Sequence, residues 1–294
     1  MTPSPSILVL GGTGLLGRPV VQRMVAEGTN VRVLTRRAAG TAEVLDPRVD
    51  IHLGDATDPG VVERAMHGCD GVHISISGSD ELAVVEAVVA AVPATGVRRI
   101  SYVSGATVHP DNAWFPMVAQ KLRSEEALAD SAVPTTVLCP TWPMEQLPRF
   151  VIGGRATVIG EQATPLHWYA AADLARMVAR AFRVDEAAGR RLFVHGPEGL
   201  TMREALSRYC AAARPEVESV ATIPLAVARA AADAGDDPVL RFMTEMMAYF
   251  DQAGEGGDPA EANRLLGGPS TTLDEWLAEH KRASRAHTGT GEAT

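Results

Sequence analysis

The feature that most constrains the fold is the alternation of short apolar, β-branched segments with amphipathic segments along the first two thirds of the chain. The short segments have the length and composition of buried strands, and the segments between them are long enough to form crossover helices. Right-handed crossovers of this kind produce a parallel sheet with helices on both faces. We therefore predict an α/β fold with a doubly wound parallel sheet. Its expected strands are residues 7–10, 31–34, 50–53, 72–76, 99–104, 136–139 and 192–195.

Several of the expected helices have recognisable first turns. Asp58 can cap a helix whose first residue is Pro59, which has no N–H to satisfy. The sequences "TMRE" (201–204) and "TLDE" (272–275) have the spacing of a capping box, in which a threonine and a glutamate each satisfy the other's backbone N–H. After about residue 195 the pattern is mostly helical, so we expect a smaller helical region there.

Composition excludes several classes of function. The net charge of −9 argues against a nucleic-acid partner, which would need a basic face. No apolar run approaches the roughly 20 residues that span a bilayer, and the first residues do not resemble a signal peptide, so we expect no membrane association and a cytoplasmic location. The three cysteines, Cys69, Cys139 and Cys210, lie too far apart to suggest a metal pair or a disulfide framework. We therefore expect buried free thiols and no metal site.

A glycine-rich segment, "GGTGLLG" (11–17), follows the first expected strand and opens a helix. Gly12, Gly14 and Gly17 fit the G-x-G-x-x-G spacing of dinucleotide-binding folds, in which glycine lets the backbone approach a pyrophosphate at the helix N-terminus. The alternative is a tight turn between strand and helix that binds no ligand. The residues of this segment expected to bind the dinucleotide are Gly11, Gly12, Thr13, Gly14, Leu15, Leu16 and Gly17.

Two arginines follow the second expected strand, at the position where NAD-binding proteins carry an acidic residue for the ribose hydroxyls. Arg36 and Arg37 would instead suit the 2′-phosphate of NADP(H), because a guanidinium binds phosphate through two parallel hydrogen bonds. A solvated basic turn is the alternative. We predict NADP(H) as the cofactor, with Arg36 as the main contact because it is nearer to the end of the strand.

Two further loops are expected to border the cofactor. Asp55 and Ala56 follow the third strand, where Asp55 either accepts from the adenine amino group or caps the turn before the next helix. Ser77 follows the fourth strand and would run past the cofactor in a sheet of the expected order.

Five segments in sequence order, "GGTGLLG", "TRR", "GDATD", "ISYVSGA" and "KLRSEEAL", resemble the short-chain dehydrogenase/reductase superfamily, in particular its atypical NmrA-like branch. The resemblance extends to about residue 280. It implies a Rossmann domain that binds NADP(H). It also implies either a reductase of quinones, enones or related carbonyl compounds, or a redox-sensing regulator without turnover.

The pattern of expected strands and helices and the composition of the last residues indicate where the domains lie. We expect an NADP-binding Rossmann core over residues 1–145. Residues 146–282 should form a mixed C-terminal part, with a returning strand near 192–195 and a smaller, mostly helical substrate region. The last segment, residues 283–294, is expected to be a flexible tail.

The chain departs from the superfamily at its catalytic motif. The resemblance places Ser104 at the catalytic serine and Lys121 at the lysine of Tyr-x-x-x-Lys, but Met117 occupies the position of the tyrosine. A thioether cannot donate a proton, so ordinary ketone reduction lacks its acid. Lys121 either binds the nicotinamide ribose or pairs with Glu125 at the surface, and Ser104 either binds a substrate oxygen or caps a turn. His109 either supplies the missing proton or is a solvated bystander.

Aromatic and sulfur-containing side chains near the ends of the later strands are candidates for an apolar pocket, because open α/β sheets bind ligands there. The candidate pocket residues are Trp114, Met117, Trp142 and Met144. The sequence thus supports two hypotheses. One is an NADPH-dependent reductase of a small, largely apolar conjugated acceptor, and the other is an NADP(H) sensor that acts through a protein partner.

Overall fold

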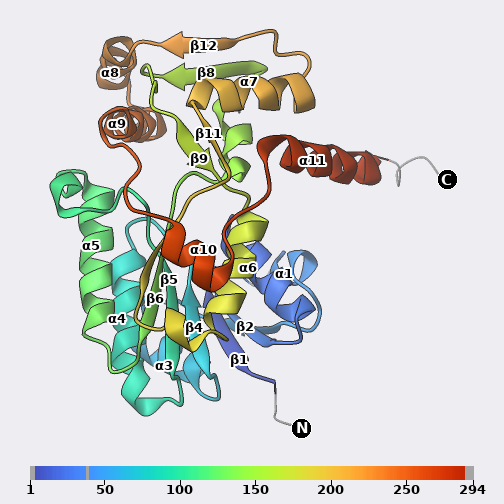
Figure 1. Cartoon of the computed structure of the whole chain (residues 1–294). Helices are drawn as coiled ribbons and strands as arrows, with labels where there is room; N and C mark the ends of the chain where they lie inside the picture. The colour runs from blue at the N-terminus through green and yellow to red at the C-terminus, as the bar shows by residue number, and fades with distance from the viewer. Residues whose placement is uncertain (1–3, 38–39, 289–294) are drawn as a thin grey trace. The chain divides into compact units, whose positions relative to one another are not determined.

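The computed structural model describes residues 4–37 and 40–288, and its largest element is a parallel sheet of seven strands in the order β10-β6-β5-β4-β1-β2-β3 (Figure 1). Each strand predicted from the sequence is present in this sheet, and the predicted doubly wound α/β fold is confirmed. The strands are β1 (Ser6–Leu10), β2 (Asn30–Thr35), β3 (Asp50–Leu53), β4 (Gly71–Ile74), β5 (Arg99–Val103), β6 (Thr135–Pro140) and β10 (Arg191–Val194).

The strand order reverses around β1, which pairs with β2 on one side and with β4 on the other. Loops that follow strands on either side of such a switch point diverge, and the crevice between them is where doubly wound sheets bind ligands. Two groups of helices pack on the sheet: α1 (Gly17–Ala26) with α6 (Ala171–Ala181), and α4 (Glu81–Ala91) with α3 (Pro59–Met66) and α5 (Pro116–Ala129). The glycine-rich turn therefore lies at the switch point.

The sheet is buried because its strands are almost entirely apolar. The side chains of Leu8, Leu10, Val72 and Ile100 belong to one core cluster and are fully buried there, as expected for a parallel sheet covered by helices. The three cysteines are buried free thiols, as predicted. Across the described residues, no helix combines the length and hydrophobicity that crossing a membrane requires.

The predicted helix caps are confirmed. The Asp58 carboxylate accepts hydrogen bonds from the N–H groups of Gly60 and Val61 at the start of α3. Thr201 and Glu204 form a reciprocal capping box at α7 (Met202–Ala213), and residues 272–275 form another at α11 (Leu273–Thr288). Each box satisfies backbone donors that a helix start would otherwise leave unpaired.

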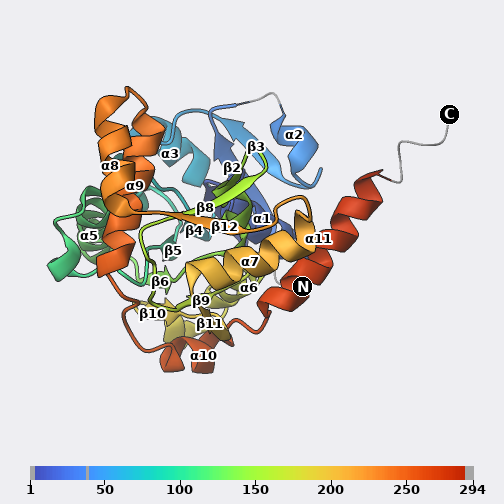
Figure 2. The ribbon, with the colours of Figure 1, turned by 90° about the horizontal axis from the view of Figure 1, so that it is seen from above.

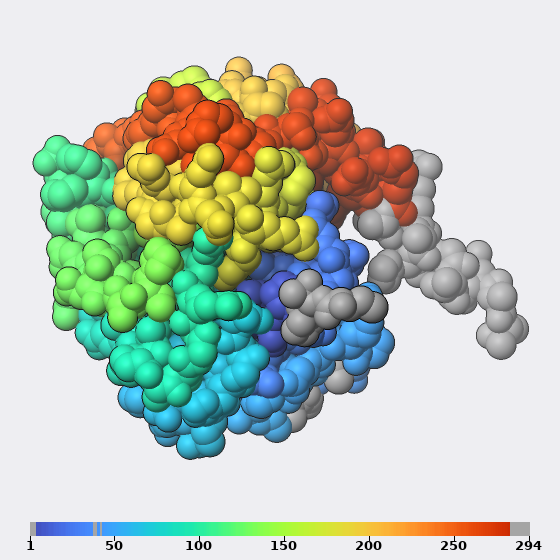
Figure 3. Space-filling model, turned by 60° about the horizontal axis from the view of Figure 1, so that its bottom comes forward, coloured from blue at the N-terminus to red at the C-terminus, as the bar shows by residue number. Residues whose placement is uncertain are grey.

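The chain divides into two compact units. The first contains residues 1–140, 171–194 and 256–269, and the second contains residues 141–170, 195–255 and 270–294. In the space-filling view, the yellow segment with α6 lies against the green and blue N-terminal segments of the same first unit (Figure 3). The sequence predicts three regions that follow one another along the chain, 1–145, 146–282 and 283–294. In the structure, each unit instead consists of three separate segments of the chain.

The second unit is mostly helical, as predicted, but it also contains small sheets. β12 (Val220–Ile223), β8 (Arg155–Ile159) and β7 (Val151–Ile152) form one, and β11 (Glu198–Leu200) pairs with β9 (Leu166–Trp168) in the other. These strands are too short to show a sequence period. Its remaining helices are α8 (Leu225–Ala234) and α9 (Pro238–Gln252), which lie side by side, and α11, which packs on α7 (Figure 2).

The end of the chain is more helical than predicted. Helix α11 continues to Thr288, so the first residues of the predicted flexible tail are part of a helix. The rest of that tail, residues 289–294, lies outside the described residues.

Candidate functional site

The glycine-rich turn between β1 and α1 depends on two of its glycines for close backbone packing. Gly11 has a φ of +85°, and a Cβ there would lie 2.3 Å from the Ser75 carbonyl oxygen. A Cβ on Gly17 would lie 2.1 Å from the Gly11 carbonyl oxygen. Any side chain at either position would therefore collide with the protein's own backbone.

Gly14 differs from these two glycines because it is exposed. Among the described residues, a Cβ at Gly14 would meet the Gly11 carbonyl oxygen alone, at 3.2 Å, and the Gly14 N–H already donates to that oxygen. A side chain at Gly14 would require the Gly11 carbonyl to move by a few tenths of an ångström, and the rest of that side chain would extend into the open space in front of the turn. This is the position at which a bound pyrophosphate needs glycine.

The first turn of α1 presents positive charge. In the described part of the chain, no side chain caps this helix and its first turn carries no acidic residue. The second helical residue is instead the exposed Arg18, although a cation is unfavourable at a helix N-terminus. The helix dipole and the Arg18 side chain together suit an anion. Arg18 is absent from the predicted site, although its position in the first turn was a usable signal.

A groove of about 260 Å³ opens beside this turn in the first unit. It brings together the glycine-rich turn, the end of β2 and the loop after β3, as the sequence predicts. Six predicted cofactor residues line it: Gly11, Thr13, Arg36, Arg37, Asp55 and Ala56. The sequence did not identify the other lining residues, which are Leu34, Thr35, Gly54, Thr57, Ile76, Asp80 and Val84. The remaining predicted contacts, Gly12, Gly14, Leu15, Leu16, Gly17, Ser77 and Lys121, lie outside this lining.

The arginines at the end of β2 are exposed, and one of them is paired. The Arg36 guanidinium lies 3.3 Å from the Asp80 carboxylate, with 67% and 48% of the two side chains exposed. The Arg37 backbone N–H donates to the Thr35 hydroxyl. Asp55 and Asp80 both line the groove together with Arg36 and Arg37. The groove therefore contains two cationic and two anionic side chains. An added phosphate would compete with Asp80 for Arg36.

Asp55 caps its own turn. Its Oδ1 atom accepts from the Thr57 N–H at 3.0 Å and from the Thr57 hydroxyl at 2.9 Å. These hydrogen bonds hold the pKa of the Asp55 carboxyl below its usual value. Of the two alternatives that the sequence left open, the structure contains the turn cap, and the adenine contact stays a prediction.

Lys121 is held in a buried ion pair that the sequence did not predict. Its ammonium donates to Glu81 Oε1 at 2.9 Å and to the Val103 carbonyl at 3.2 Å. The same Glu81 oxygen accepts from the Tyr102 hydroxyl. Burial and the adjacent Glu81 carboxylate raise the pKa of Tyr102 above its usual value, so this phenol stays protonated.

Ser104 belongs to a neighbouring network. Its hydroxyl donates to the Glu125 carboxylate, which also accepts from Arg191 Nε at 2.9 Å. Glu125 therefore has partners other than Lys121, the residue with which the surface alternative paired it. The Arg191 guanidinium in turn donates to the Val108 carbonyl and fixes the loop after β5. Ser104 is buried, and its single hydroxyl hydrogen is donated to Glu125.

The remaining catalytic and pocket candidates are dispersed. His109 is 64% exposed, lies 3.3 Å from Asp111 and caps a short 3₁₀ turn, η2 (Pro110–Asn112). Trp114 is 56% exposed, and Met117 is half-buried one helical turn before Lys121.

Trp142 and Met144 lie in the hydrophobic core of the second unit. Trp142 packs against Phe250 with ring centroids 4.7 Å apart, and Met144 is fully buried. Packing explains both side chains, and their role in a substrate pocket stays a prediction.

The most important residue that the sequence-based prediction missed is Glu81, which pairs with Lys121 and accepts from Tyr102. It was detectable, because Glu81 shares the buried face of an apolar helix with Val84, Val85 and Val88. A carboxylate on such a face needs a cationic partner, since burying an unpaired charge is costly. The identity of that partner depends on how α4 packs on α5.

Comparisons with known proteins agree with this geometry. Over 94% of this chain and 98% of the relative, the chain is 27% identical to a (4-alkanoyl-5-oxo-2,5-dihydrofuran-3-yl)methyl phosphate reductase from Streptomyces griseus. It is 26% identical, over the same shares of both chains, to an NAD(P)H azoreductase from Xenophilus azovorans. An NADPH-dependent quinone oxidoreductase from Escherichia coli, solved with NADPH, has the same fold. Its TM-score is 0.74 at 21% identity, over 93% of this chain and 99% of that one.

A family described as NAD(P)H-binding matches residues 11–184, which begin at the glycine-rich turn and extend past β6 and α6. The resemblance that the sequence motifs indicate is thereby confirmed. On this match and on the sheet, turn and groove described above, the chain belongs to the NAD(P)H-binding family.

Proposed function

We propose that this protein is an NADPH-dependent reductase that transfers hydride to a small, largely apolar conjugated acceptor, such as an enone or a quinone. The observation that carries the proposal is the groove of the first unit, in which the glycine-rich turn and the arginines at the end of β2 line one continuous surface. The proposal has two parts, the choice of cofactor and the class of acceptor.

The groove fits the adenosine half of a dinucleotide. The space in front of Gly14 is the one that a Cβ would fill, and the uncapped start of α1 with Arg18 suits a pyrophosphate. Arg36 and Arg37 would hold a 2′-phosphate, which favours NADP(H) over NAD(H). When bound, the cofactor supplies the hydride, and the protein supplies orientation and electrostatics.

The acceptor class follows from the residue at position 117. Met117 stands one helical turn before Lys121, where the short-chain enzymes that this chain resembles carry a tyrosine. Without that acid, an acceptor whose negative charge spreads over a conjugated system is favoured, because solvent can protonate it afterwards. The Streptomyces griseus relative supports this choice, since the name of its substrate describes a ring C=C bond conjugated to carbonyl groups.

Two side chains are assigned roles in this proposal. Lys121 would orient the nicotinamide ribose, and the Glu81 carboxylate would hold its ammonium in place. Ser104 would bind the acceptor oxygen by turning its hydroxyl hydrogen from Glu125 toward that oxygen, while the Glu125 carboxylate keeps its ion pair with Arg191. Neither residue needs to transfer a proton for a conjugated acceptor to be reduced.

Calorimetric titration with NADPH and NADH tests the choice of cofactor. We expect tighter binding of NADPH, and we expect Arg36→Ala to remove most of the preference, because a lost charge-assisted phosphate contact costs about 1.5–3 kcal/mol. Asp80→Asn is the matched variant: it frees Arg36 from an exposed ion pair worth about 0.2–1 kcal/mol and should strengthen NADPH binding by up to about fivefold. Equal affinity for the two cofactors in the unmodified protein would refute the proposal.

The acceptor class is tested by following NADPH oxidation with enones, quinones, azo compounds and unconjugated ketones. We expect turnover of conjugated acceptors and little or none of simple ketones. If simple ketones are reduced as fast, the inference from Met117 is wrong. Tight NADPH binding without oxidation by any acceptor would instead identify a sensor.

A further inference from the structure

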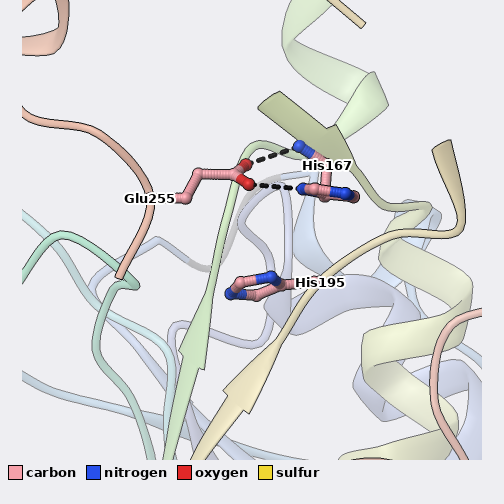
Figure 4. Close-up of side chains that lie close together, drawn as sticks. All are labelled: His167, His195 and Glu255. Carbon is pink, nitrogen blue, oxygen red and sulfur yellow. Dashed lines mark hydrogen bonds and ion pairs between the residues drawn. The ribbon is translucent and has the colours of Figure 1, made fainter. Parts of the chain in front are cut away.

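Two histidines and a glutamate of the second unit lie together, far from the glycine-rich turn in the sequence. His167, His195 and Glu255 each offer one donor atom, and these atoms all lie within 4.8 Å of one another (Figure 4). All three side chains are partly buried. The two imidazoles stack with centroids 5.5 Å apart and planes 24° from parallel. Nothing in the reductase proposal uses this cluster.

The backbone builds the cluster through an unusually close approach. The Gly196 N–H donates to the His167 carbonyl at 3.0 Å, and a Cβ on Gly196 would lie 1.6 Å from the Trp168 carbonyl oxygen. No residue except glycine fits there. Because His195 directly precedes Gly196, this contact between backbones places the His195 imidazole beside that of His167 in β9.

Glu255 holds His167 through both of its carboxylate oxygens, as the dashed lines in Figure 4 show. Glu255 Oε1 accepts from the His167 backbone N–H, and Glu255 Oε2 lies 2.6 Å from His167 Nδ1. The Thr141 hydroxyl donates to the His167 carbonyl. The main chain of His167 is therefore held on both sides, while 44% of its side chain remains exposed and accessible to an ion.

We propose that His167, His195 and Glu255 form a binding site for a divalent transition metal ion, with Zn²⁺ as the best-suited ion. Two imidazoles and one carboxylate are a donor set that Zn²⁺ accepts, and three protein ligands leave a fourth tetrahedral position open for water or another ligand. Imidazole and carboxylate together do not suit Ca²⁺ or Mg²⁺, which prefer oxygen ligands.

Zinc binding requires small movements. With bonds of about 2.0–2.1 Å, tetrahedral donors lie about 3.4 Å apart. The pair Glu255 Oε2 and His167 Nδ1, now at 2.6 Å, must therefore open by about 0.8 Å, and any wider pair must close by at most about 1.4 Å. Rotation of the side chains achieves both. In the tautomer with the ring hydrogen on Nδ1, the ion takes the place of that hydrogen, which moves to Nε2 of His167, so the exchange releases no proton.

The test is calorimetric titration of ZnCl₂ into tag-free protein that has been treated with a chelator and then freed of it. We expect one Zn²⁺ per chain, a rise in the melting temperature on zinc addition, and a loss of affinity of at least about tenfold in His195→Ala and in Glu255→Gln. His195→Ala leaves both hydrogen bonds between Glu255 and His167 intact, so it carries the test if Glu255→Gln fails to fold.

The matched control is His67→Ala. His67 lies 3.7 Å from Glu63 in the first unit, a histidine–glutamate pair that is not part of any three-donor group among the described residues. This variant should bind zinc with unchanged affinity. The proposal is overturned if the unmodified protein binds no stoichiometric zinc, if His195→Ala binds it equally well, or if His67→Ala weakens it as strongly as the cluster variants do.

Discussion

The buried pair of Glu81 and Lys121 makes the sharpest prediction about stability. We consider Glu81→Gln, which keeps the shape of the side chain and an oxygen for the Tyr102 hydroxyl but removes the negative charge. In the native protein 1% of the Glu81 side chain and 10% of the Lys121 side chain are exposed. The variant would leave the Lys121 ammonium buried without a counter-charge.

The magnitude follows from that burial. Removal of one partner of a buried ion pair costs about 3–5 kcal/mol, because the remaining charge is neither solvated nor compensated. By comparison, an exposed pair contributes about 0–1 kcal/mol. We therefore expect Glu81→Gln to lower the free energy of unfolding of the first unit by about 3–5 kcal/mol. Adding Lys121→Met should recover much of this loss, because it removes the orphaned charge as well.

Hydrogen–deuterium exchange of peptides from α4 and β5 measures this local stability. A loss of about 3 kcal/mol corresponds to exchange roughly a hundredfold faster or more, since about 1.4 kcal/mol is a factor of ten. Glu86→Gln is the matched control: it removes the same charge from an exposed position of the same helix and should change exchange little. Exchange in Glu81→Gln as slow as in Glu86→Gln would refute the assignment of Glu81 as the counter-charge.

Two further predictions concern the glycine-rich turn and a buried histidine. Gly14→Val should abolish dinucleotide binding in calorimetry while circular dichroism stays native, whereas Gly17→Val should fail to fold because its Cβ would lie 2.1 Å from the Gly11 carbonyl oxygen; micromolar binding by Gly14→Val would contradict a pyrophosphate site. Burial lowers the pKa of His73 from 6.5 to about 3, so the unfolded state binds a proton that the folded state does not between these values. Stability is complete above about pH 6.5 and should fall with acidification by about 1.4 kcal/mol per pH unit from this residue alone; urea denaturation of His73→Asn at pH 7, 6 and 5 should show a smaller slope.

The sequence alone determined those structural features that depend on residues close together along the chain. The seven strands of the main sheet, the cap at Asp58 and both capping boxes are local patterns of hydrophobicity and hydrogen bonding, and all are present. The glycine-rich turn could also be predicted from the sequence, because its glycine spacing lies between an expected strand and an expected helix, which is the context that a dinucleotide-binding turn requires.

The cofactor groove was predictable in part, for a related reason. Parallel strands end at the same edge of a sheet, so the turn after β1, the arginines after β2 and Asp55 after β3 had to lie near one another once the strand order was inferred. The prediction missed Asp80, which reaches Arg36 across 44 residues of sequence from the loop before α4.

What only the tertiary structure decided is which charged and polar side chains meet. Lys121 pairs with Glu81, which is 40 residues away, and not with Glu125 four residues along its own helix. His167 meets Glu255 across 88 residues, and in the second unit β8 pairs with β12 and β9 with β11, each from a distant segment of the chain. Periodicity fixes which face of an element is buried, but the partner on the other side is set by how two elements pack, and no local pattern encodes that choice.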